Sequence, residues 1–136
     1  MNRIAALGVI SGLAAGCGLP LDEGNYNVDF TTVSDTCDAP RPPPTVWHMA
    51  EADGAWTLTN TRNDFAASGR ELGDQMVFET TRDDTTTTGC RLLGDYRIEL
   101  EPEGDTFFGD ILISIRAECD GSMCSSAFIC DGKKVD

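Results

Sequence analysis

The stretch TFFGDILISIRAEC, residues 106–119, decides the fold, because its apolar and polar side chains alternate almost without interruption. A repeat of two residues is the period of a β-strand with one buried and one solvent-facing side. One face carries Ile111, Ile113, Ile115, Ala117 and Cys119, and the other carries Ser114, Arg116 and Glu118. Gly109 lies near the start of the stretch, where we expect a bulge or bend. The stretch therefore predicts a long strand that is buried on one side.

Shorter stretches with the same alternation occur along the chain. The pair Asp53-Gly54 separates two of them and is a strong signal for a two-residue hairpin turn. Residues 39–45 hold four prolines and are expected to form an extended connecting loop. Residues 63–74 are expected to form a loop, and residues 82–89 a polar turn. Strands are expected at residues 25–33, 46–52, 55–62, 75–81, 95–101, 106–119 and 125–130.

About seven or eight strands with short turns, and no convincing helix after the N-terminal segment, predict an all-β fold. Each strand would bury one face, so the sheet must close into a barrel or fold into a sandwich. We expect a small antiparallel barrel of lipocalin-like outline. With 136 residues the chain has the length of a single domain.

The chain is strongly acidic, with 23 Asp and Glu residues against 10 Lys and Arg residues and a net charge of −13. Nucleic acids are bound through Lys and Arg patches that contact phosphates, so this charge argues against a nucleic-acid partner. It argues equally against direct binding to anionic lipid headgroups. We interpret the acidity mainly as a source of solubility at a crowded surface.

The N-terminal segment has the layout of an export signal. Arg3 is followed by 13 uncharged residues, positions 4–16. A membrane-spanning helix needs about 20 apolar residues, so this run is too short to cross a bilayer. The segment ends in AAGC, residues 14–17, which resembles the lipobox of bacterial lipoprotein precursors. The resemblance covers residues 1–17 and no more of the chain.

The resemblance to lipoprotein precursors implies that Cys17 is lipidated, with palmitate-type acyl chains, and becomes the first residue of the mature protein. It divides the chain into a signal peptide (1–16), a lipidated tether (17–25) and a single disulfide-containing β domain (26–136). Gly18 stands where Asp would retain such a protein in the inner membrane. The resemblance therefore implies anchoring in the outer membrane, on its periplasmic or surface face. A plain signal peptide and a buried N-terminal helix are the alternatives.

Five cysteines remain if Cys17 carries lipid, and export places them in an oxidising compartment where disulfides form. The candidates for disulfides are Cys37, Cys90, Cys119, Cys124 and Cys130. Five thiols allow two disulfides and one free cysteine. We expect Cys37 to pair with Cys90, and two of the last three cysteines to pair with each other. A zinc site is the alternative, but the spacing lacks the C-x₂-C knuckle of structural zinc.

No catalytic motif is visible, and we expect no enzyme, no cofactor and no resident metal. The chain lacks the G-x-S-x-G elbow of serine hydrolases and the C-x-x-C pair of redox proteins. Its one histidine, His48, lies between two apolar residues and is expected to be structural. The acidic turns at residues 83–84 and 120–121 do not match the calcium-binding loop pattern.

Two classes of function fit these features. The first is a membrane-anchored exported lipoprotein that acts as a binding module, either for a small apolar ligand in a barrel or for a protein such as a secreted enzyme that it inhibits. The second is a structural envelope lipoprotein without a ligand. A filled interior with an exposed apolar patch would indicate a protein partner. Ligand binding would be indicated by a pocket lined by Trp47, Trp56, Phe78 and Tyr96.

Overall fold

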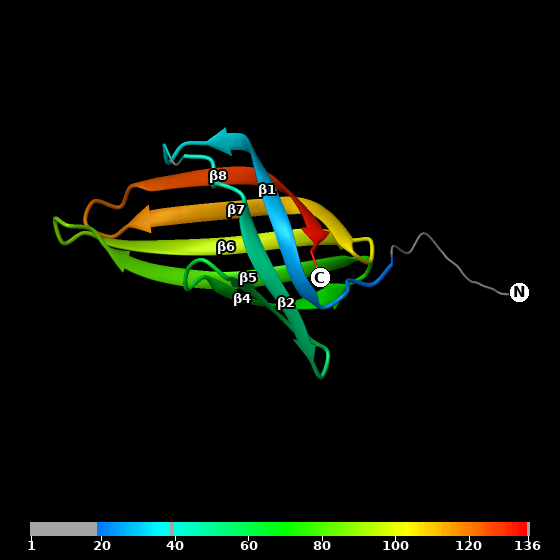
Figure 1. Ribbon diagram of the computed structural model, residues 1–136. Helices are drawn as coiled ribbons and strands as arrows, with labels where there is room; N and C mark the ends of the chain where they lie inside the picture. Colours follow the sequence, from blue (N-terminus) through cyan, green and yellow to red (C-terminus); the bar gives the residue numbers. More distant parts are fainter. Residues whose placement is uncertain (1–18, 39, 136) are drawn as a thin grey trace, which may run out of the picture.

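Eight antiparallel strands form a closed barrel in the computed structural model, which describes residues 19–38 and 40–135. The strands follow one another around the barrel in chain order, and the last strand returns to pair with the first (Figure 1). The described residues form no helix. The predicted all-β antiparallel barrel is confirmed. The strands are β1 (Gly24–Asp35), β2 (Thr45–Ala52), β3 (Ala55–Asn60), β4 (Ala66–Leu72), β5 (Gln75–Thr85), β6 (Arg91–Pro102), β7 (Thr106–Ala117) and β8 (Met123–Lys134).

Alternate turns gather at the same end of the barrel, because every strand runs antiparallel to its neighbours. The turns after β2, β4 and β6 lie at one end, where β1 begins and β8 ends; we call it the closed end (Figure 1). The turns after β1, β3, β5 and β7 lie at the other end, which we call the open end. Asp53 and Gly54, both at positive φ, make the predicted two-residue turn between β2 and β3.

Aromatic side chains fill the barrel near its closed end. Trp47 stacks on Phe107 with ring centroids 5.9 Å apart, and Phe107 contacts the ring of Tyr26 at 5.2 Å. The Tyr26 hydroxyl lies 2.6 and 3.1 Å from the main-chain oxygens of Asp22 and Gly104. Burial raises the pKa of Tyr26 to about 12, so the hydroxyl keeps its proton and can donate to these oxygens. This hydroxyl joins the segment before β1 to the turn after β6.

The start of the described chain packs against the closed end. Leu21 is buried in the core cluster. The Asp22 N–H donates to the Gly104 oxygen at 2.9 Å, and the Gly104 N–H donates to the Leu19 oxygen at 3.4 Å. This part of the expected tether is therefore held on the barrel.

The prediction of a loop at residues 63–74 is wrong, because most of this segment forms the strand β4. This strand pairs with β3 on one side and with β5 on the other. Ala67 is its one buried side chain, and Gly69 packs its main chain against Phe78. The alternation that marks the other strands is therefore nearly absent here, and pairing with neighbours makes this segment a strand. β8 also extends past its predicted end at residue 130.

The predicted bulge at Gly109 is also wrong, since β7 stays in register with both of its neighbours. A Cβ at this position would collide with the Glu99 main-chain oxygen and would lie 2.8 Å from Leu100 Cδ2. Glycine is needed here because β6 passes too close to leave room for a side chain.

We expect Gly109→Ala to lower the free energy of unfolding by about 1–3 kcal/mol, because the added methyl group overpacks the core and displaces β6. Equilibrium unfolding in urea measures this loss. Ser114→Ala on the exposed face of the same strand is the matched control and should change stability by less than about 0.5 kcal/mol. Equal stability of the two variants would contradict the close approach of β6 and β7.

Candidate functional site at the open end

Five strands extend beyond the other three at the open end. β1 pairs with β2 only as far as Val28, and β5 pairs with β4 only as far as Glu79. β1 continues beside β8 to Asp35, and β5 continues beside β6 to Thr85. At about 3.3 Å per residue, β5 extends about 20 Å beyond its last pair with β4. These parts of β5, β6, β7, β8 and β1 form an open half-barrel, which we call the overhang.

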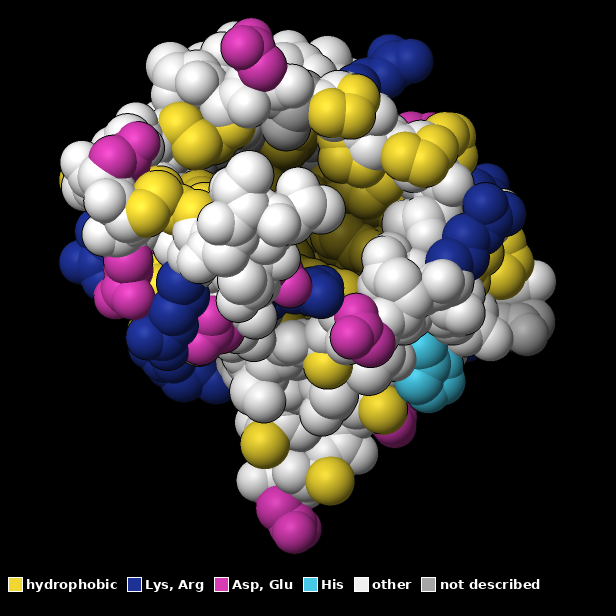
Figure 2. All heavy atoms as spheres, turned by 90° about the vertical axis from the view of Figure 1, so that its left-hand side faces the viewer, with side chains coloured by type: hydrophobic (Ala, Val, Ile, Leu, Met, Phe, Trp, Pro, Cys, Tyr) yellow, Lys and Arg dark blue, Asp and Glu magenta, His cyan; other side chains and the backbone are white. Residues whose placement is uncertain are grey.

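The inner face of the overhang is mainly apolar. Its half-buried apolar side chains come from β6 and β7, together with one phenylalanine from the connection before β4. We call this set the apolar floor: Phe65, Leu92, Tyr96, Ile113, Ile115 and Ala117. Figure 2 views the molecule from this end and shows a hollow with hydrophobic side chains inside it. The barrel is therefore filled near its closed end and hollow at its open end.

Aromatic contacts organise the apolar floor. Phe65 meets the ring of Tyr96 edge-on with centroids 5.4 Å apart, and Phe65 and Ile113 both pack against the filled core. Gly94 leaves room for the Tyr96 ring, since a Cβ there would lie 3.1 Å from it. Each half-buried apolar side chain would contribute roughly 1 kcal/mol if a ligand covered it.

One ion pair lies at the side of the hollow. Arg82 is opposite Gly94 on the inner face of β5, and its Nη2 donates to Asp64 Oδ1 at 3.1 Å. The two residues line a groove of about 350 Å³ along β5, which also includes Phe65. The Asp64 side chain is largely exposed, so this ion pair contributes little to stability. An anionic group on a ligand could therefore replace Asp64 beside Arg82.

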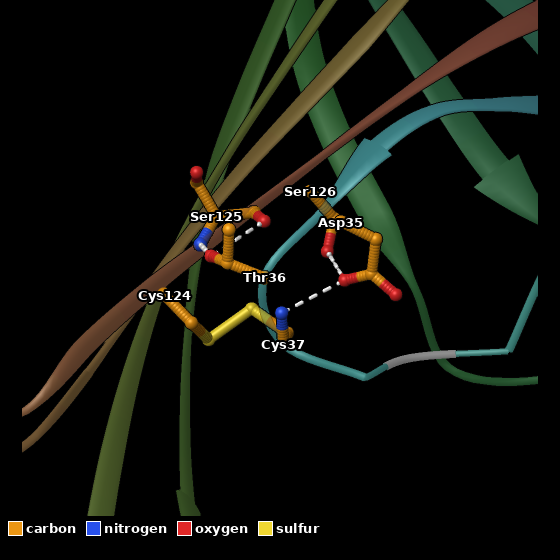
Figure 3. The surroundings of a disulfide bond; sticks show 6 residues. All are labelled: Asp35, Thr36, Cys37, Cys124, Ser125 and Ser126. Atoms are coloured by element: carbon orange, nitrogen blue, oxygen red, sulfur yellow. Dashed lines mark hydrogen bonds between the residues drawn. A yellow bond between two sulfur atoms is a disulfide. The ribbon is translucent and has the colours of Figure 1, made fainter.

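A disulfide between Cys37 and Cys124 joins the end of β1 to the start of β8 (Figure 3). Beside it, the Ser125 N–H donates to Thr36 Oγ1 at 2.9 Å, and the Thr36 N–H donates to the Ser125 main-chain oxygen at 2.8 Å. The Cys37 N–H donates to Asp35 Oδ1 at 2.8 Å. These bonds hold the end of β1 against β8 where β2 no longer supports it.

A second disulfide, between Cys90 and Cys119, joins the turn after β5 to the turn after β7. Next to it, Arg91 donates to Asp83 with a shortest distance of 2.6 Å and to Glu118 at 3.3 Å. The side-chain hydrogen bonds from Arg91 lower the pKa of Asp83. Both disulfides therefore lie at the rim of the hollow.

The described residues contain two disulfides and one free cysteine, as predicted, but the predicted pairing is wrong. Cys37 pairs with Cys124 and not with Cys90, and Cys119 pairs with Cys90 and not within the last three cysteines. β7 and β8 lie between β6 and β1 in the barrel. At about 4.8 Å per strand, the ends of β1 and β6 are roughly 14 Å apart, whereas a disulfide needs Cα atoms within about 7 Å.

Cys130 is the free cysteine among the described residues, and it is fully buried in the core. Burial and the nearby charges of Asp131 and Asp110 raise the pKa of its thiol to about 12. A neutral buried thiol is a poor nucleophile, so Cys130 acts here as a small apolar side chain.

The four residues expected to line a ligand pocket are not brought together. Trp47, Trp56 and Phe78 are buried in the filled core, and only Tyr96 reaches the hollow. Sequence reasoning missed most of the apolar floor, because it assigned the isoleucines of β7 to one continuous core.

His48 lies apart from the hollow: it is exposed, and its Nδ1 lies 2.9 Å from Asn25 Oδ1. Cys17, the predicted lipidation site, is outside the described residues. Across the described ranges, 19–38 and 40–135, no three metal-ligating side chains cluster together. No described segment is a helix of the length and apolarity needed to cross a bilayer.

Comparisons with protein families, with curated proteins and with solved structures find no match to this chain. The geometry of the open end therefore carries the functional argument.

Removing the Cys37–Cys124 disulfide is expected to cost more stability than removing Cys90–Cys119, because it closes a loop of 87 residues rather than 29. The chain-entropy relation gives losses of about 4.6 and about 3.6 kcal/mol. Chemical unfolding of the C37S/C124S and C90S/C119S variants measures the two free energies. A larger loss of stability in C90S/C119S would contradict the explanation that these disulfides stabilise the protein by restricting the unfolded chain.

Proposed function

We propose that this protein is a lipid-anchored, exported binding module that takes an apolar ligand into the open end of its barrel. The observation that carries this proposal is the apolar floor, six half-buried apolar side chains that line a hollow while the rest of the interior is filled. Concave apolar surfaces with a few polar groups at their edge are typical of small-molecule sites. Arg82 and Asp64 supply such polar groups.

The hollow is suited to binding because cross-links between its strands form the site in the absence of a ligand. Two disulfides and the hydrogen bonds of Arg91 hold the strands of the overhang together. A preformed site loses less conformational entropy on binding and therefore binds more tightly. We propose binding without catalysis, since the apolar floor offers hydrophobic contact but no nucleophile beside a base.

The lipid anchor and the hollow would lie at opposite ends of the domain. The described chain starts at Leu19 on the closed end, and Leu19 is two residues after Cys17. Two residues span at most about 7 Å, so lipidation of Cys17 would place the closed end next to the bilayer. The open end would then face the aqueous side, and the ligand would enter from water.

We expect the protein to raise the fluorescence of the neutral apolar dye N-phenyl-1-naphthylamine. Ile115→Ser should weaken dye binding about tenfold, because it removes apolar contact from the floor of the hollow. The matched control is Leu72→Ser, which removes an exposed apolar side chain at the closed end and should leave binding unchanged. Absence of dye binding, or equal loss in both variants, would contradict a binding site in the hollow.

The anchor is tested separately. Cys17→Ser in the producing bacterium should abolish lipidation, leave the signal segment uncleaved and remove the acyl mass that the wild type carries. Ser11→Ala within the same segment is the control and should be processed normally. Intact mass spectrometry and membrane fractionation give both readouts. Normal processing of Cys17→Ser would contradict the lipoprotein proposal and leave the ligand proposal standing.

A further inference from the structure

The outer face of β7 and β8 carries an exposed apolar strip, which lies over the filled core of the barrel. β7 presents Phe108 and Leu112 outward, and these side chains are 50% and 46% exposed. Ile129 of β8 lies between them along the strands, directly opposite Asp110. Exposed apolar side chains that adjoin one another in this way commonly mark an interaction surface.

Carboxylates surround this strip. Phe108 lies directly opposite Asp131 on β8 and Glu101 on β6. Asp131 in turn lies directly opposite Asp29 on β1. We call the strip and its nearest aspartates the acidic–apolar face: Asp29, Phe108, Asp110, Leu112, Ile129 and Asp131.

Two cross-strand pairs at this face place like charges directly opposite each other, Asp29 with Asp131 and Glu99 with Asp110. Like charges directly opposite each other destabilise a sheet. Arg97 offsets Glu99 at 2.6 Å, but the ion pairs of the described residues do not include Asp29, Asp110 or Asp131. These aspartates weaken the isolated fold, so a partner that neutralises them accounts for their position better than folding does.

A groove of about 690 Å³ adjoins the acidic–apolar face over β5, β6 and β7. Leu112 and Arg97 belong to its lining, so the apolar strip continues into a concave surface. Lys133 is the next outward residue of β8 after Asp131 and lies at the opposite border of the face. The cations thus flank the carboxylates rather than pair with all of them.

We propose that the acidic–apolar face binds a cationic amphipathic segment of a partner protein. Lys or Arg side chains of the partner would contact Asp29, Asp110 and Asp131, and its apolar side chains would cover Phe108 and Leu112. Charge complementarity selects this occupant. A second copy of the chain is disfavoured as the occupant, because it would bring the same carboxylates together and carries a net charge of −13 itself. Phosphate-bearing surfaces would also be repelled by these carboxylates. The inference is independent of the hollow and of the lipid anchor.

The test uses the oxidised protein and a fluorescein-labelled amphipathic peptide of Lys and Leu residues, followed by fluorescence anisotropy. The D110N/D131N variant should weaken peptide binding about tenfold and flatten its dependence on salt. The matched control E71Q/D74N removes two exposed charges at the closed end and should change affinity by less than about twofold. The D110N/D131N variant should also be at least as stable as the wild type, because it relieves like-charge repulsion.

Two further variants separate the alternatives. Phe108→Ser should weaken peptide binding, because it removes the largest side chain of the apolar strip, whereas Ile115→Ser in the hollow should leave it unchanged. Equal weakening by the two charge-removing variants would overturn the proposal, because the peptide would then respond to net charge alone. Failure of the wild type to bind at low salt, or loss of binding in Ile115→Ser, would overturn it as well.

Discussion

The pairing of β1 with β8 is the constraint on which the rest of the structure depends. β1 bonds to β8 from Tyr26 to Asp35, but to β2 only as far as Val28. The long pairing closes the ring over the filled part of the barrel, whereas β1 after Val28 and β5 after Glu79 each keep one unpaired edge in the overhang. Because the pairing of β1 with β2 stops at Val28, no strand lies opposite the overhang across the hollow. One strand therefore both closes the barrel and keeps one of its ends open.

The fold class could be predicted because the period of a strand is visible in the side chains themselves. The alternation in residues 106–119 is enough to define β7, and similar patterns define most of its neighbours. The hollow could not be predicted in the same way. Ile111 and Ile113 share a face and a chemistry, and they differ in burial only because other strands cover the first more fully than the second. That difference depends on where β2 and β4 begin at the open end, which no local pattern shows.

The disulfides show the same division between local and long-range information. Cys90 and Cys119 each lie two residues beyond the inward-facing pair of Leu92 and Ala117, so the register of one hairpin brings them together. Aligning the two predicted strands of the β6–β7 hairpin around their turn would have placed Cys90 opposite Cys119 and so predicted this disulfide from the sequence. The partner of Cys37 depends instead on β1 meeting β8 across the whole length of the chain. Only the closed ring determines it.

The acidic–apolar face lies mainly over the filled core and reaches the overhang at Leu112, which points outward from β7 beside the inward-facing Ile113. A sheet with solvent on both sides buries little apolar area and gains little from the hydrophobic effect. The overhang is instead supported by covalent bonds: both disulfides of the described residues lie there, and the filled closed end has none. The proposed ligand site gives a reason for this covalent support, because the hollow exists only where the overhang extends beyond β2, β3 and β4.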